Sequence, residues 1–125
     1  GISRFASALD GLARVLAVDP AFVRMRDRDL VDGQHRNDTT RADYFTTAYF
    51  HRPEELGDEL AAAGFADARV LGVEGPAWIV ADFDARWADP VLHADMMAVA
   101  RAVEAEPAML GVSAHLLAIG RKAPH

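Results

Sequence analysis

The stretch YFHRPEELGDELAAAGFADARVLGVEGPAW, residues 49–78, decides the fold, because a helix signal and a strand signal follow each other within it. Pro53 suits the first position of a helix, where its missing N–H costs nothing. Leu56 and Leu60 repeat at the i, i+4 spacing of one helix face, and Gly64 suits the residue after a helix end. The stretch therefore predicts a helix that starts at Pro53 and is closed by Gly64.

Two strands are predicted, one directly after this helix and one near the end of the chain. Residues 68–73 are rich in aliphatic side chains and are followed by turn residues. Residues 114–119 are apolar on both faces, which is typical of a buried strand. His115 within them is interpreted as a hydrogen-bonded core histidine. The sequence leaves the mutual direction of the two strands open, because a long segment with its own helix separates them.

Three further helices are predicted from their start signals and apolar stripes. Asp19-Pro20 and Asp89-Pro90 each place an N-cap aspartate before a proline at the first helical position, which predicts helices over about 20–31 and from 90 onward. The mixed charges over 24–29 indicate a solvated face of the first of these helices. Residues 4–17 predict another helix, in which period 3.6 gives the apolar stripe Phe5, Leu9, Leu12 and Leu16.

The middle of the chain combines a polar loop with an aromatic segment. Residues 33–43 are rich in turn-forming side chains and predict a loop. Residues 44–50 fit either a strand or a loop folded over a pocket. The aromatic side chains here and beyond either line a ligand pocket or fill a small core, and the sequence favours neither; they are Tyr44, Phe45, Tyr49, Phe50, Trp78 and Trp87.

Composition narrows the class of protein. The 125 residues, of which 51% are hydrophobic, suit one domain with a packed core. The net charge of −6 without a basic cluster argues against nucleic-acid binding and against docking on anionic membranes. The absence of cysteine excludes disulfides, thiolate zinc sites and iron–sulfur clusters. No apolar run approaches the ~20 residues of a membrane span, and the cytoplasm is the expected location.

No motif of catalysis stands out. The five histidines form no i, i+3 or i+4 pair, so no metal-binding residue is assigned. No serine lies in a Gly-x-Ser-x-Gly context, and no glycine-rich phosphate loop occurs. His51, at the end of the aromatic segment, is the candidate general base, and the alternative is that it caps or packs beneath the helix that follows.

Residues 49–78 together with SAHLLAIGRK, residues 113–122, resemble the C-terminal part of class I S-adenosylmethionine-dependent methyltransferases of type 11. The resemblance implies an α+β chain that is the C-terminal portion of a Rossmann-like α/β domain, mostly helical with two to three strands. Residues 1–50 are then the end of the fifth strand and a helical insertion over the substrate side. Residues 51–125 are the last helix-strand units, including the sixth strand, and a final antiparallel strand.

The resemblance also implies a function. The intact parent would transfer a methyl group from S-adenosylmethionine to a small molecule, and this chain would supply the substrate side. The implied base is His51, and the implied substrate contacts are Tyr44, Tyr49, Phe50, Arg52 and Trp78. The family's glycine-rich turn and acidic strand end have no counterpart here, so no cofactor-binding residue is assigned and the chain alone is expected to be inactive. Lacking its central strands, it is also expected to self-associate.

Two alternatives stay open. One is a complete module that binds an apolar ligand through the aromatic segment or dimerises through its helices. The other is a metal-free hydratase or isomerase built around His51 and a nearby carboxylate.

Overall fold

Three helices of the structure begin at the prolines where the sequence predicts them, at Pro20, Pro53 and Pro90, whereas the helix over Phe83–Ala88 was not predicted. In this computed structural model, which describes residues 1–122 and 124, the Asp19 carboxylate accepts a hydrogen bond from the backbone N–H of Ala21, and Asp89 caps a second helix in the same way. His125 lies outside the described residues. The α-helices are α1 (Ala6–Ala13), α2 (Pro20–Asp32), α3 (Pro53–Ala62), α4 (Phe83–Ala88) and α5 (Pro90–Val103), and the short 3-10 helices are η1 (Leu16–Val18), η2 (Ala42–Tyr44), η3 (Gly75–Ile79) and η4 (Leu110–Val112).

In the part of the chain that the structure describes, five strands form two small sheets. They are β1 (Ile2–Ser3), β2 (Gln34–His35), β3 (Ala48–His51), β4 (Phe65–Gly72) and β5 (Leu116–Lys122). In the first sheet β3 is central, parallel to β1 and antiparallel to β2. In the second sheet β4 and β5 are antiparallel, which settles the direction that the sequence left open. The fold is therefore mixed α+β, with three strands of only two to four residues.

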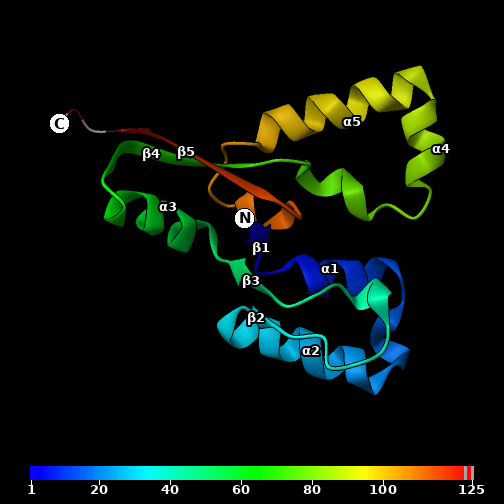
Figure 1. Ribbon diagram of the computed structural model, residues 1–125. Coiled ribbons are helices and arrows are strands. Elements are labelled where there is room, and N and C mark those ends of the chain that lie inside the picture. Colours follow the sequence, from blue (N-terminus) through cyan, green and yellow to red (C-terminus); the bar gives the residue numbers. More distant parts are fainter. Residues whose placement is uncertain (123, 125) are drawn as a thin grey trace.

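One antiparallel bridge joins the two sheets and places β5 between β1 and β4 (Figure 1). The backbone N–H of Leu116 donates to the carbonyl of Gly1 at 2.8 Å, and the amino group of Gly1 donates to the carbonyl of Leu116 at 2.8 Å. Since β5 is antiparallel to both neighbours, β1 and β4 run in the same direction. Helix α3 connects β3 to β4 and packs against β4.

Helices lie on either side of these strands. In Figure 1, α1 and α2 form a lower lobe, and α4 and α5 form an upper lobe. The buried core of the lower lobe is the cluster Leu16, Phe22, Met25 and Tyr44. Met96 and Ala100 are the buried residues of α5.

The first predicted helix is shorter than expected. Residues 4–17 contain α1 followed by a break at Val15, whose φ is 56°, and then η1. The predicted apolar stripe is wrong in its middle, because Leu12 is 78% exposed. The buried residues of α1 are Ser7 and Gly11. Gly11 lies directly against Phe22 of α2, because a Cβ added to this glycine would lie only 2.5 Å from Cε1 of the Phe22 ring. Close approach of α2, and not apolar patterning, decides which side of α1 faces inward.

Three further predictions of burial are corrected. The charged run of α2 is not wholly solvated, because Asp29 is fully buried against His35. The strand over 114–119 is observed as β5, and it is not covered on both faces, since Leu117 is 50% exposed. His115 is not a core residue: its side chain is exposed and pairs with Glu74. Among residues 1–122 and 124, no helix has the length and the apolar character that crossing a membrane requires.

Candidate functional site

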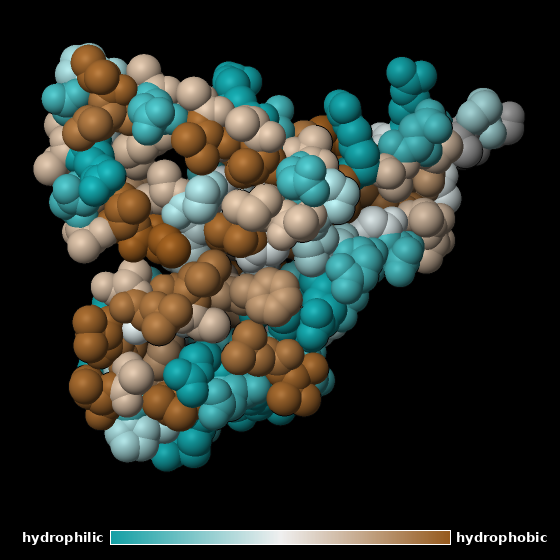
Figure 2. Space-filling model, turned by 180° about the vertical axis from the view of Figure 1, so that it is seen from behind, coloured by the Kyte–Doolittle hydropathy of each residue, from teal (hydrophilic) through white to brown (hydrophobic). Residues whose placement is uncertain are grey.

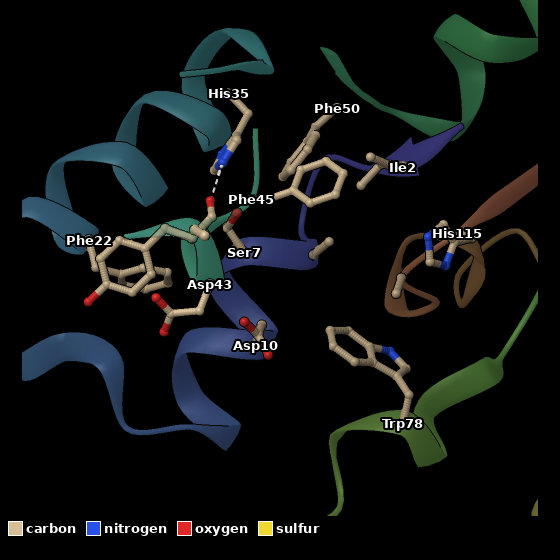
Figure 3. Close-up of a pocket in the computed structure, with 14 residues that line it drawn as sticks. Ile2, Ser7, Asp10, Phe22, His35, Asp43, Phe45, Phe50, Trp78 and His115 are labelled. Carbon is tan, nitrogen blue, oxygen red and sulfur yellow. Dashed lines mark hydrogen bonds between the residues drawn. The ribbon is translucent and has the colours of Figure 1, made fainter. Parts of the chain in front are cut away.

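A cavity of about 300 Å³ lies between α1, α2 and η2 on one side and η3 and the start of β5 on the other (Figure 3). On the face shown in Figure 2, apolar side chains gather on both sides of the notch between the two lobes. The volume lies at the lower end of the range for small-molecule sites. The cavity is lined by Ile2, Ala6, Ser7, Asp10, Phe22, His35, Ala42, Asp43, Tyr44, Phe45, Phe50, Trp78, Ala114 and His115.

Aromatic rings stand on two sides of the cavity. The rings of Phe22 and Tyr44 lie 5.4 Å apart, and those of Phe45 and Phe50 lie 6.5 Å apart. Trp78 stands on the opposite side (Figure 3), where its indole N–H donates to the carbonyl of Val112 at 2.8 Å. That hydrogen bond fixes the ring's orientation, so the wall is largely set before a ligand enters.

A buried ion pair supports this wall. His35 Nδ1 lies 2.8 Å from a carboxylate oxygen of Asp29, and its Nε2 lies 2.8 Å from the backbone carbonyl of Tyr44. Both ring nitrogens face acceptors, and a protonated ring can donate to both at once. The hydrogen bond to Asp29 accordingly raises the pKa of His35 above its usual 6.5. The ring also stacks on Phe50, with centroids 4.7 Å apart.

The pair holds a strained residue at the edge of the cavity. Phe45 has φ 69° and ψ −169°, a region that is almost restricted to glycine. The carbonyl before it, on Tyr44, accepts from His35, and its own carbonyl accepts from the Asn37 amide at 2.8 Å. These two hydrogen bonds offset the strain and keep the Phe45 ring against the cavity.

Two aspartates line the cavity, Asp10 and Asp43, and both form ion pairs with arginines. Arg14 contacts Asp10 and Asp43, each at 3.0 Å, and Arg41 contacts Asp43 at 2.8 Å. The hydrogen bond from Arg41 lowers the pKa of Asp43, so this carboxylate stays ionised. The second oxygen of Asp10 accepts no hydrogen bond from any residue that the structure describes.

The structure brings together three of the six residues predicted as a site. Tyr44, Phe50 and Trp78 line the cavity. Tyr49 and His51 lie on the other face of β3 from Phe50, as expected from the alternation of side chains along a strand.

The three residues outside the cavity contact α1 and α3 and their termini. The Tyr49 hydroxyl lies 3.2 Å from Glu55, and His51 Nε2 lies 3.2 Å from Glu59. The Arg52 guanidinium lies 5.6 Å from the centre of the Phe5 ring, next to the start of α3. A catalytic role for His51 remains a prediction.

Sequence reasoning missed Ser7, Asp10 and the Asp29–His35 pair. One signal for the pair was present: Asp29 follows the buried residues Phe22 and Met25 at helical spacing. A carboxylate on an inward face requires a partner. Ser7 and Asp10 gave no such signal, because their apolar neighbours suggested a different buried face of α1.

The residues present do not fit an S-adenosylmethionine site. Helix α1 follows β1 through Arg4-Phe5, and α3 follows β3 through Arg52, so neither turn is rich in glycine. Within residues 1–122 and 124, no group of three or more His, Asp or Glu side chains could hold a metal ion. The chain matches no family model, no curated protein and no solved structure.

Proposed function

We propose that this chain forms the acceptor-binding side of a class I S-adenosylmethionine-dependent methyltransferase that acts on a small molecule. In this proposal the aromatic-walled cavity holds the methyl acceptor. The cofactor site belongs to a part of the parent protein that this chain does not contain. A cytoplasmic location is part of the same proposal.

The arrangement of β1, β5 and β4 carries the proposal. The resemblance assigns these strands as the fifth, the final antiparallel and the sixth. In the structure β1 and β4 run in the same direction, α3 precedes β4, and β5 runs antiparallel between them. A helix-containing connection between two parallel strands is typical of α/β domains.

The position of the cavity supports the same function. Ligands of open α/β sheets bind beyond the carboxyl ends of the parallel strands. The residues that follow β1, among them Ala6 and Ser7, line the cavity, and so does Trp78, which follows β4. A ligand here would lie where two parallel strands end.

The chemistry that these residues offer is positioning. The aromatic wall excludes water and orients a ring, and proximity is the main source of rate in such transfers. His35 has both nitrogens occupied, and His51 lies across β3 from the cavity. The proposal therefore requires no base among the lining residues.

The test compares the coding frame with the purified chain and then assays the complete gene product. We expect a frame that extends upstream through a glycine-rich turn, and a product that transfers labelled methyl groups from S-adenosylmethionine to a small molecule. Trp78→Ala should lower kcat/KM, whereas the exposed Leu12→Ala should not. A frame that begins near Gly1, or a complete product that binds no S-adenosylmethionine, would overturn the proposal.

The residues that wall the cavity all come from this chain, and this observation favours a second function. The chain would then be a ligand-binding module without catalysis. Thermal stabilisation by an apolar ligand, together with the absence of methyl transfer by the complete gene product, would support it.

A further inference from the structure

We infer that the cavity takes a planar aromatic compound that carries an amino or hydroxyl group and no negative charge. This rests on the proposed function only in naming that compound the methyl acceptor. The binding preference itself follows from the cavity's lining.

The aromatic requirement follows from the wall. The rings of Phe45 and Phe50 stand on one side and Trp78 on the other, and each is fixed by contacts described above. Aromatic pairs prefer offset or tilted ring arrangements, and such pairs add to the energy of apolar burial. A flat ring between these walls would meet ring faces and edges on both sides.

The polar requirement follows from two side chains on one face of α1. Ser7 is only 9% exposed, lines the cavity, and its hydroxyl has no hydrogen-bond partner among residues 1–122 and 124. Asp10, three residues further along, also lines the cavity and keeps one carboxylate oxygen free of protein donors. Residues three apart on a helix are neighbours. A ligand amine or hydroxyl can therefore meet both groups at once.

The exclusion of anions follows from the charges. No Lys or Arg lines the cavity. The guanidinium groups of Arg14 and Arg41, which contact the lining carboxylates, are engaged by Asp10 and Asp43. His35 pairs with the carboxylate of Asp29, and His115 pairs with Glu74. A carboxylate or phosphate on the ligand would lose its hydration and meet carboxylates without a free cation.

The test uses three matched probes, phenethylamine, 2-phenylethanol and 3-phenylpropionate, titrated calorimetrically into the chain at pH 7. We expect phenethylamine to bind at least about tenfold more tightly than 3-phenylpropionate, with the alcohol between them. Asp10→Asn should remove most of that difference, and Ser7→Ala should weaken the amine and the alcohol alike. Asp27→Asn, an exposed carboxylate paired with Arg26 outside the cavity, is the matched control and should change nothing.

Equal or tighter binding of 3-phenylpropionate would overturn the inference, and so would the absence of binding by all three probes. A preference that survives Asp10→Asn in a variant with an unchanged circular dichroism spectrum would also overturn it. These measurements use neither S-adenosylmethionine nor turnover. If the amine binds most tightly and the carboxylate least, but the complete gene product transfers no methyl group, only the proposed function is contradicted. If the complete gene product methylates an anionic acceptor, only this inference is contradicted.

Discussion

Gly33 occupies a place in which a side chain has no room. Its φ is 73°, and a Cβ there would lie 2.7 Å from Nε of Arg4 and closer still to the carbonyl of Phe50. Its own carbonyl accepts a hydrogen bond from the N–H of Phe50 at 2.7 Å. The end of α2 is thereby brought against β3. Gly64 has a similar φ of 82°, with nothing within 4 Å of the position of a Cβ.

Gly33→Ala and Gly64→Ala therefore separate backbone strain from steric contact. Gly64→Ala should cost about 1 kcal/mol, the penalty of a left-handed conformation. Gly33→Ala should cost about 3 kcal/mol or more, because the same penalty is joined by overlap with Arg4 and Phe50. Urea denaturation of both variants measures the difference, and equal losses would contradict the steric argument.

His35 should make the stability of the chain depend on pH. Its pKa in the folded state is raised, chiefly by the hydrogen bond to Asp29, above the usual 6.5. The stabilisation is therefore complete below about pH 6.5 and is lost as the pH rises through the folded-state pKa. The positive charge of Arg28 opposes this shift.

The measurement is the urea midpoint between pH 5.5 and 9. The wild-type midpoint should fall across this range, and His35→Gln should flatten the fall while lowering the midpoint most at the acidic end. His93→Gln is the control and should keep the wild-type slope, because His93 contacts the backbone carbonyl of Trp87 and no carboxylate among residues 1–122 and 124. A slope that His35→Gln leaves unchanged would show that other groups carry it.

For single residues, the sequence predicted the roles that depend on neighbours close by in the chain. Asp19 and Asp89 were identified as N-caps because a cap and its helix are adjacent. Asp29 was misassigned because its partner, His35, is reached only after the chain turns at Gly33. Local charge patterning contains no information about that turn.

Among the elements, Arg4 is the residue that ties the most together. Its side chain is 3% exposed and donates to the carbonyl of Phe50 in β3 at 2.8 Å and to Glu55 in α3 at 2.9 Å. A longer contact of 3.4 Å reaches the carbonyl of Val31 in α2. The planar guanidinium thus joins the exit of β1 to three other elements.

Arg4→Lys should destabilise the chain by about 2 kcal/mol, because one ammonium group cannot reach acceptors in three directions. Arg26→Lys makes the same substitution at the exposed pair with Asp27, where the expected change is below about 0.5 kcal/mol. Thermal and urea unfolding of the two variants should differ accordingly. A loss at Arg4→Lys no larger than that at Arg26→Lys would mean that Arg4 is not a structural link.

The elements that sequence reasoning found are those with strong local signals. Helices α2, α3 and α5 begin at the predicted prolines, and β4 and β5 overlap the two predicted strands. Strands β1, β2 and β3 are too short for alternation to indicate them. They exist because backbone groups distant in sequence pair with one another. The cavity, which lies between α1, η2 and η3, was for that reason only half predicted.

For the whole molecule, the amount of uncovered apolar surface has a consequence in solution. Helix α3 has no buried residue, and Leu117 of β5 is half exposed. A second cavity of about 430 Å³ lies between α3 and β5 and is lined by Gly1, Leu56, Glu59, Leu60, Leu116, Leu117 and Ala118. Surfaces of this kind promote association.

We expect the purified chain to self-associate through the surface of α3 and β5. Sedimentation velocity should show an average mass that rises with concentration. Leu117→Asp should reduce this rise, whereas Val31→Asp, on the exposed side of α2, should not. A monomer at every concentration would contradict the expectation, and an equal effect of both variants would place the contact elsewhere.

The central position of β5 also sets an order of events in folding. Strand β4 is synthesised well before β5, with which it pairs. The amino group of Gly1 donates to the carbonyl of Leu116, which lies 115 residues further along the chain. Until β5 emerges from the ribosome, β4 has no strand beside it and β1 lacks one of its two neighbours. Closing so long a loop is slow compared with forming helices. The join between the two sheets is therefore a late step, and both β1 and β4 have an open edge until β5 is in place.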